Sequence, residues 1–239
     1  MILYNVEIYF MMFMIYAVAG WIMECTLGVI QKHKFVNRGF LIGPYCPIYG
    51  VGVVSVSLLL TRFSKNYILL FFLACLVCGV LEYLTSYFME KIFKARWWDY
   101  TRRKFNINGR VCLTNAFLFG LLGVLLVYII NPFLLEVINK IDAKVLNILS
   151  ITLGAIFIID FTTSMKITYK LKNTIKKLRK DNTEEFNNKI KEVIEGKILN
   201  RRIFKAFPKF KINIIDIKDI KNKIEEEMQY PGTIKVTVI

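Results

Sequence analysis

Three acidic residues lie inside long apolar stretches of the chain, where a charged group needs a chemical reason to be present. They are Glu24, Glu82 and Asp160, each flanked on both sides by mostly hydrophobic residues. A charged side chain at the centre of a membrane helix costs about 2.5–3.5 kcal/mol on insertion scales, so such residues pair, bind a substrate or carry protons. One interpretation is structural, with Arg38 and Arg110 as bidentate partners that fix helix packing. The other interpretation places the three acids in a substrate-binding or proton-carrying site.

These acids belong to apolar runs long enough to cross a membrane, which takes about 20 residues. The chain has 239 residues, of which 55% are hydrophobic. We predict an all-α, polytopic membrane protein in which residues 1–165 form a five-helix transmembrane domain. Residues 166–239 contain no such run, and we predict a small, basic, mostly helical tail with amphipathic helices. One of these helices, over 166–180, continues the fifth membrane helix, and a further helix is predicted over 215–229. The five apolar runs are 8–30, 40–60, 67–89, 111–130 and 145–165.

The distribution of Lys and Arg indicates how these helices are oriented. Positive residues collect in the cytosolic segments of membrane proteins. The pattern predicts an N-terminus outside and a C-terminus inside, in a multi-pass protein of the cytoplasmic (inner) membrane. The net charge of +15 comes from an excess of Lys and Arg. We expect these residues to bind anionic lipid rather than nucleic acid, because no nucleic-acid-binding motif is present. Lys and Arg are sparse in 1–9, 61–66 and 131–144, and they gather in 31–39, 90–110 and 166–239.

This orientation puts the three acids at one depth and makes a repeat visible. Each acid precedes the next cytosolic Lys by six to nine residues, which places it on the order of 9–14 Å from the cytosolic boundary at 1.5 Å per residue. An acid-bearing helix, a basic loop, a turn of Asn, Gly and Arg, and a return helix occur twice, with the turns at 37–39 and 108–110. The pattern predicts two helical hairpins related as parallel repeats, followed by one more helix.

The second apolar run begins with residues that disfavour a regular helix. Residues 38–52 include Gly43, Pro44 and Pro47, together with further glycines. An interior proline removes a backbone hydrogen bond and clashes with the preceding turn. Broken backbone at membrane depth is tolerated only inside protein or along a water-filled cavity. A kinked packing helix is one interpretation. We favour a broken or re-entrant segment that lines, with Tyr49, a cytosol-facing cavity.

The loop at 90–110 combines aromatic residues with cations. Because Trp and Tyr favour the headgroup level of a bilayer, an interfacial anchor is the first interpretation. The second is that the loop closes the cavity beneath the acidic layer. The candidate substrate-binding or cavity-lining residues are therefore Glu24, Arg38, Gly43, Pro44, Pro47, Tyr49, Glu82, Trp98, Asp99, Asn106, Arg110 and Asp160.

Metal and cofactor chemistry is not indicated by the sequence. His33 is the single histidine, so a zinc site is not expected. The pair Cys75 and Cys78 fits small hydrophobic side chains packed in a helix. The Walker A pattern GxxxxGK[ST] does not occur, so the chain cannot hydrolyse ATP through a P-loop. These features favour a non-enzymatic function without cofactors.

The motifs of the two hairpins resemble those of a known family. Over about residues 15–125 the pattern is similar to bacterial membrane proteins described as putative ABC-transporter type IV, or putative ABC-transporter permeases. The resemblance implies a permease subunit that depends on a separate ATPase. The motifs are Gly20-Trp-x-x-Glu24, Arg38-Gly-Phe-Leu-x-Gly-Pro-x-Cys-Pro-Ile-Tyr-Gly-x-Gly52, Leu81-Glu82-Tyr, Arg96-Trp-Trp-Asp-Tyr100 and Asn106-x-x-Gly109-Arg110-x-Cys-Leu113.

The sequence is compatible with three functions. The first is a permease-like component that moves a small solute or lipid, and that forms a homo-oligomer because five spans are few for a transport path. The second is an intramembrane enzyme acting on lipid-linked substrates, with Glu24 or Glu82 as general base and arginines holding phosphate. The third is a non-catalytic membrane scaffold or sensor that uses the tail.

Overall fold

The computed structural model describes residues 2–33, 35, 37–178, 211–212 and 215–216. This part of the chain is mostly helical, as the apolar runs predict, and its strands have only two residues each. A 3₁₀ turn, η1, follows α2, and a π-helical turn, η2, joins α4 to α5. The helical elements are α1 (Ile2–Lys32), α2 (Pro47–Leu60), η1 (Thr61–Phe63), α3 (Tyr67–Phe93), α4 (Leu113–Leu125), η2 (Leu126–Ile130), α5 (Asn131–Asn139) and α6 (Ala143–Leu178).

Four helices are long and apolar enough to cross a membrane: Tyr4–Ile30, Tyr67–Phe93, Leu113–Asn139 and Ala143–Lys170. Each therefore extends for about 40 Å at 1.5 Å per residue. The helix Pro47–Phe63 is also apolar but shorter. The lengths and compositions of the helices support a multi-pass membrane protein, whereas a fifth span and the orientation stay predictions.

Local side-chain chemistry sets several helix ends. Asn66 caps α3 by accepting hydrogen bonds from two backbone N–H groups of its first turn, at 3.1 and 3.0 Å. Asp142 does the same for α6, with one bond of 2.9 Å. Pro47 lies in the first turn of α2, where its missing N–H leaves no helical bond unmade. Helix α3 ends at Lys94, whose φ of 56° is in the left-handed region that stops a helix.

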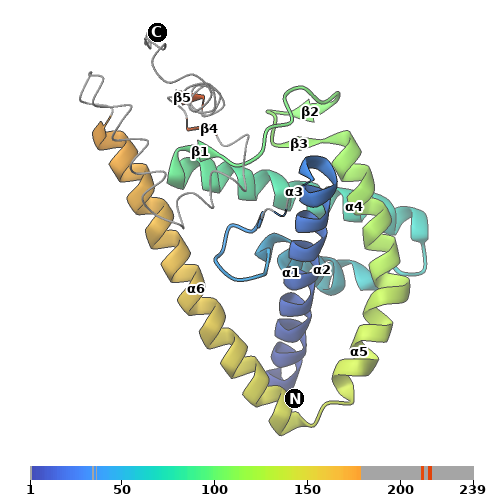
Figure 1. The fold of residues 1–239 in the computed structure, drawn as a ribbon. Coiled ribbons are helices and arrows are strands. Elements are labelled where there is room, and N and C mark those ends of the chain that lie inside the picture. Colours follow the sequence, from blue (N-terminus) through green and yellow to red (C-terminus); the bar gives the residue numbers. More distant parts are fainter. Residues whose placement is uncertain (1, 34, 36, 179–210, 213–214, 217–239) are drawn as a thin grey trace.

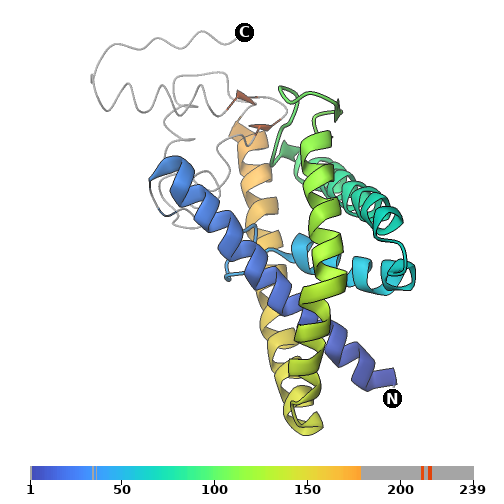
Figure 2. The ribbon, with the colours of Figure 1, turned by 90° about the vertical axis from the view of Figure 1, so that its right-hand side faces the viewer.

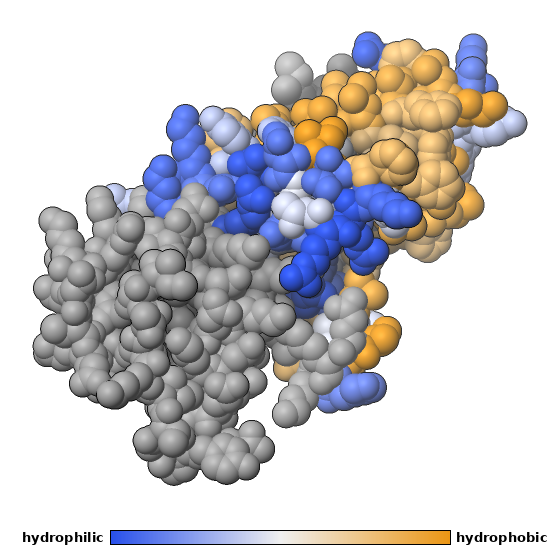
Figure 3. Space-filling model, turned by 90° about the horizontal axis from the view of Figure 1, so that it is seen from above, coloured by the Kyte–Doolittle hydropathy of each residue, from blue (hydrophilic) through white to orange (hydrophobic). Residues whose placement is uncertain are grey.

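The helices divide the molecule into two ends. The N-terminus and the connection between α5 and α6 lie at one end. The carboxyl end of α6 lies at the other, with the short strands β1 (Ala95–Arg96), β2 (Asn106–Ile107) and β3 (Val111–Cys112) (Figure 1). The view in Figure 2 shows the same division, and in both views α2 runs across the direction of α6. Seen from the strand-bearing end, hydrophilic residues form a central patch beside hydrophobic sides (Figure 3). Arg102, Arg103 and Lys104 are exposed in the loop at this end.

Glycines allow the helices to approach closely. A side chain on Gly50 of α2 would overlap the carbonyl oxygen of Phe13 on α1. A side chain on Gly123 of α4 would in the same way meet Ala74 of α3. Small residues at such contacts let membrane helices pack backbone against backbone. The α1–α2 and α3–α4 pairs are therefore fixed by sterics as well as by apolar contact.

Replacing Gly50 with Ala is expected to lower the free energy of unfolding by about 1–3 kcal/mol, the usual cost of overpacking. The cost arises because the added methyl group meets main-chain atoms of Phe13, which cannot rotate away. Gly52 supplies a matched control, since nothing lies within 4 Å of its Cβ position. Gly52→Ala is expected to be neutral or stabilising, because Ala has the higher helix propensity. Denaturant titration in lipid–detergent micelles measures both variants, and equal losses would contradict the steric explanation.

A buried polar bridge joins three helices near the middle of the molecule. The Tyr16 hydroxyl donates to Asn131 Oδ1 at 2.6 Å, and Asn131 Nδ2 donates to Ser57 Oγ at 2.9 Å. Pro132 follows directly, and the π-helical turn η2 precedes it. Because a proline clashes with the carbonyl one turn earlier, the wider π turn accommodates it without ending the helix. The bridge thus ties α1 and α2 to the point where α4 continues into α5.

Apolar clusters pack the remaining helices against one another. Met12, Ile138 and Leu146 join α1, α5 and α6, and further buried residues join α2, α3 and η2. Leu41 and Tyr45 pack against α1 and belong to the segment that precedes α2. Polar side chains of other helices make hydrogen bonds to this segment, and they form part of the candidate site.

Two small sheets lie at the strand-bearing end, and the sequence did not predict them. The tail helix predicted over 215–229 is wrong at its start, because Ile215 and Asp216 form a strand, while its remainder lies outside the described residues. Helix α6 continues past residue 165 to Leu178, in agreement with the prediction that the amphipathic helix over 166–180 continues the last membrane helix. The antiparallel pairs are β2 (Asn106–Ile107) with β3 (Val111–Cys112), and β4 (Lys211–Ile212) with both β1 (Ala95–Arg96) and β5 (Ile215–Asp216).

Candidate functional site

The segment before α2 is not helical, which confirms the break that its glycines and prolines predict. Gly43 and Pro44 lie in a series of bends, and Pro47 begins the helix. The backbone N–H of Cys46 donates to the carbonyl oxygen of Ala17, half-way along α1, at 2.8 Å. The segment therefore reaches into the helical part of the molecule before α2 begins.

Asp160 on α6 holds this segment. Its carboxylate accepts hydrogen bonds from the backbone N–H groups of Ile42 at 3.0 Å and Gly43 at 2.6 Å. The hydroxyl of Tyr45 donates to it at 2.6 Å, and that of Ser164 at 2.8 Å. Hydrogen bonds to an ionised acceptor are about twice as strong as neutral ones. The four donors therefore stabilise the charged form of Asp160.

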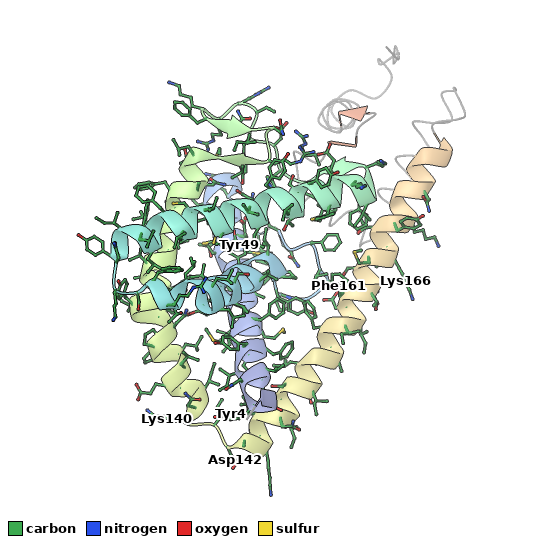
Figure 4. All side chains as sticks on the ribbon, turned by 180° about the vertical axis from the view of Figure 1, so that it is seen from behind. Tyr4, Tyr49, Lys140, Asp142, Phe161 and Lys166 are labelled. Carbon is green, nitrogen blue, oxygen red and sulfur yellow. The ribbon has the colours of Figure 1, made fainter. Side chains whose placement is uncertain are left out.

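Glu24 on α1 is bound from two directions. The hydroxyl of Tyr49 donates to Oε1 at 2.6 Å, and Nη1 of Arg38 lies 3.4 Å from Oε2. Figure 4 shows Tyr49 in the interior of the molecule, in the region of α2 and α3. The side chains of Glu24 and Arg38 remain 27% and 28% exposed. This ion pair is therefore only partly buried.

Glu82 on α3 is the most buried of the three acids, at 6% exposure. Its Oε1 accepts hydrogen bonds from the hydroxyl of Tyr100 at 3.1 Å and from Asn115 Nδ2 at 3.3 Å. Asn115 also donates to the Tyr100 oxygen at 2.8 Å. Its Oε2 is buried and has no hydrogen-bond partner among the described residues. The same part of the chain provides no cationic side chain in an ion pair with Glu82.

Two of the three acids lie within electrostatic reach of each other, and the third is bonded elsewhere. Glu24 is near enough to Glu82 to repel a negative charge there. Tyr49 and Tyr100, which donate to these two acids, are likewise within electrostatic reach of each other. Asp160 is bonded instead to the segment before α2. Glu24 and Glu82 thus influence each other electrostatically, whereas Asp160 separately anchors the segment before α2.

A second charged cluster lies where α3 meets the loop 94–112. Glu90 Oε2 lies 3.1 Å from Arg96 Nη2 and 2.8 Å from Arg110 Nη2. Asp99 extends the cluster, 3.8 Å from Arg96 Nη1. Trp98 Nε1 donates to the carbonyl oxygen of Arg110 at 2.9 Å. The cluster therefore fixes the loop to the end of α3 at two points, Arg96 and Arg110.

Hydrogen bonds within the loop position Tyr100. Asn106 Oδ1 accepts from the N–H of Gly109 at 2.9 Å, and Gly109 in turn accepts from the N–H of Tyr100 at 2.8 Å. Gly109 has φ +67°, a conformation that favours glycine. Burial and the nearby carboxylate of Glu82 raise the pKa of Tyr100 above its ordinary value. Tyr100 thus remains a hydrogen-bond donor at neutral pH.

Several of these contacts differ from what the sequence indicates. Arg38 pairs with Glu24, as the structural interpretation expects, whereas Arg110 pairs with Glu90 rather than with one of the three acids in the apolar runs. Tyr100 closes the motif Arg96-Trp-Trp-Asp-Tyr100, and that position is the signal that could have identified it. Asn115 could have been noticed as an amide near the start of an apolar run. Other contributors that sequence reasoning missed are Glu90, Tyr45 and Ser164.

The residues of the site suit hydrogen bonding and charge rather than metal ligation. Within the described part of the chain, no group of three His, Cys, Asp or Glu side chains could hold a metal ion. The fold and the site thus define a multi-pass, helical membrane protein with acidic groups inside its helices.

The comparisons with known proteins place the chain in a family. The family described as putative ABC-transporter type IV matches residues 11–165, which is more than half of the chain. The chain therefore belongs to this family, as the motifs indicate. No curated protein and no solved structure matches it.

Proposed function

We propose that the chain is the permease-like component of a transporter in the cytoplasmic membrane, where it moves a small solute or a lipid. Membership of an ABC-transporter-type family supports a transport component. The positive-inside rule supports a cytosolic location for the loop 94–112 and an N-terminus outside. In this arrangement α2 joins the four long helices as an additional membrane helix, which brings the number of spans to five. Because α2 is short, the non-helical residues before it cross the remaining thickness of the membrane.

The observation that carries the proposal is non-helical backbone bonded to an acid of a helix long and apolar enough to cross a membrane, which in this proposal puts that backbone at membrane depth. Asp160 lies well inside the apolar helix Ala143–Lys170 and bonds to Ile42 and Gly43. Such backbone is tolerated at that depth only inside protein or along a water-filled cavity. Broken segments of this kind form the binding sites of many transporters. We therefore place a cytosol-facing polar cavity next to the segment.

The substrate path in this proposal runs beside Glu24 and Arg38. Both side chains are partly exposed, and together they offer an anionic and a cationic group to a zwitterionic solute or a lipid headgroup. Arg is well suited to planar, bidentate recognition of carboxylate and phosphate. Tyr49 adds a hydroxyl to the same position. The pair thus provides recognition without a covalent step.

Transport energy is expected from a separate ATPase, because the chain has no P-loop of its own. The exposed cations Arg102, Arg103 and Lys104 project from the loop 94–112 and offer a docking surface for an acidic face of such a subunit. Phe105 and Ile107 beside them are 78% and 61% exposed. A basic rim around apolar side chains is typical of a protein-binding surface.

Cross-linking in native membranes, followed by purification of the full chain and mass spectrometry, tests this proposal. An ATP-binding subunit is expected to co-purify and to confer ATP hydrolysis on the complex. Substituting Arg102, Arg103 and Lys104 together by Glu should abolish its recovery. Lys140→Glu is the matched control, since Lys140 is exposed at the opposite end (Figure 4). Recovery of the chain without any ATP-binding subunit, or equal loss in the control, would refute ATPase dependence.

A further inference from the structure

The three acids in the apolar helices differ in how their negative charge is balanced. Glu24 has the guanidinium of Arg38, and Asp160 has two backbone N–H groups and two hydroxyls. Glu82 has two neutral donors, both on Oε1, although it is the most buried of the three. Removing an uncompensated carboxylate from water costs several kcal/mol. The surroundings of Glu82 therefore favour an uncharged carboxyl group.

Among the described residues, the charged or titratable groups within reach of Glu82 are compatible with that state. Cys78 lies on α3 within electrostatic reach, and Tyr100 reaches in from the loop 94–112. From α1 comes the negative charge of Glu24, which further disfavours a second anion. Helix α4 contributes Asn115, an amide that does not titrate. None of these groups supplies a positive charge.

We propose that Glu82 Oε2 is a proton-binding site of the membrane domain and that it carries its proton in the structure described here. A lone pair of Oε2 forms the O–H bond, and the hydronium ion that delivers the proton leaves as water. Tyr100 and Asn115 keep Oε1 as the hydrogen-bond acceptor, so the proton is directed to the other oxygen. The proposal goes beyond the transport function and stands without it, because it follows from the contacts of Glu82 alone.

The protonation state of Glu82 is also linked to the loop at the strand-bearing end of the molecule. Tyr100 belongs to the loop 94–112, which Glu90 fixes to α3 through Arg96 and Arg110. If Glu82 loses its proton, its charge strengthens the bonds from Tyr100 and Asn115 and attracts water or a cation to Oε2. Protonation of one buried oxygen thereby alters the contacts of a charged surface loop.

Infrared spectroscopy of the full chain in lipid vesicles tests the proposal directly. The C=O stretching band of a protonated carboxyl group is expected at neutral pH and should shift in D₂O. Glu82→Gln should abolish this band. Glu7→Gln is the control, because Glu7 is the other buried glutamate among the described residues and bonds to Asn147 instead. A band that is absent from the wild type, or that disappears in Glu7→Gln rather than in Glu82→Gln, would overturn the proposal.

A second variant keeps the test decisive if Glu82→Gln does not fold. Tyr100→Phe removes one donor to Oε1, so the same band should move to the position of a less strongly hydrogen-bonded carbonyl. An unchanged band position would show that the signal does not arise from Glu82. Replacing choline chloride by sodium chloride at constant pH forms the last arm. The band is expected to be unaffected, and its loss in sodium would identify a metal cation rather than a proton as the occupant.

Discussion

Asp160→Ala is expected to lower the free energy of unfolding by about 3 kcal/mol, the upper part of the range for hydrogen bonds to a charged group. The carboxylate is the shared acceptor for the N–H groups of Ile42 and Gly43 and for the hydroxyl of Tyr45. Alanine leaves the N–H of Gly43 and the hydroxyl of Tyr45 without this acceptor, whereas the N–H of Ile42 keeps a second acceptor, Ser164 Oγ, at 3.2 Å. Thermal and denaturant unfolding in lipid–detergent micelles measures the loss.

The matched control for this variant is Thr163→Ala. Thr163 is exposed on the same helix, and its hydroxyl bonds to the carbonyl oxygen of Ile159 in that helix. We expect a change within about 0.5 kcal/mol, as for surface substitutions generally. Thiol labelling gives an independent measurement, because Cys46 is buried at the end of the anchored segment. Labelling should accelerate in Asp160→Ala but not in the control, and equal rates would show that Asp160 does not hold the segment.

The sequence predicts that Asp160 and the broken segment before α2 are special, but it does not predict how they contact each other. Gly43 and Pro44 indicate broken backbone, and Asp160 indicates an acid inside a helix, since each violates a rule for membrane helices. That the two features bond to each other does not follow from the sequence. The donors are backbone N–H groups, which every residue except proline carries, so no residue type marks them. The side-chain partner Tyr45 is one of many tyrosines in the chain.

The predicted repeat has the same limits. In the first predicted turn Asn37 accepts a hydrogen bond from the N–H of Gly39. In the second, Gly109 donates instead to Asn106, which precedes the predicted turn 108–110, while Asn108 donates to the hydroxyl of Tyr83. The two turns therefore share residue types but not the same hydrogen bonds. The arginine partners differ, because α3 extends to Phe93 and presents Glu90 where Arg110 arrives. A short repeat of residue types in the sequence thus predicts neither the hydrogen bonds within the turns nor the contacts between helices.

Helix lengths show why the number of spans is harder to predict than the number of apolar runs. The run at 40–60 is apolar throughout, but only its second part forms α2, because the first part is broken by Gly43 and Pro44. The run at 111–130 instead continues as helix to Asn139, since η2 accommodates Pro132. Hydropathy reports composition, whereas the ends of helices depend on backbone hydrogen bonds that hydropathy does not measure.

The second large effect is expected from Glu90. Its carboxylate bonds to both Arg96 and Arg110, and the three side chains are only 15%, 19% and 13% exposed. Removing one partner of a buried ion pair costs about 3–5 kcal/mol, because the remaining charge has no compensation. The residual exposure of these side chains lowers the expectation for Glu90→Gln to about 2–4 kcal/mol. Gln retains the shape and one acceptor, so the loss reports the charge rather than a cavity.

Glu136→Gln provides the control, since Glu136 pairs with Lys140 at 2.7 Å while both side chains remain 66% and 71% exposed. This pair should contribute about 0.5 kcal/mol or less, as exposed helix pairs do. Unfolding in micelles measures both variants, and near-UV circular dichroism follows the loop through Trp98, which bonds to Arg110. A change in the tryptophan signal is expected only for Glu90→Gln. Equal stability losses in the two variants would mean that burial does not strengthen the Glu90 cluster, and that the loop 94–112 is held by its apolar contacts instead.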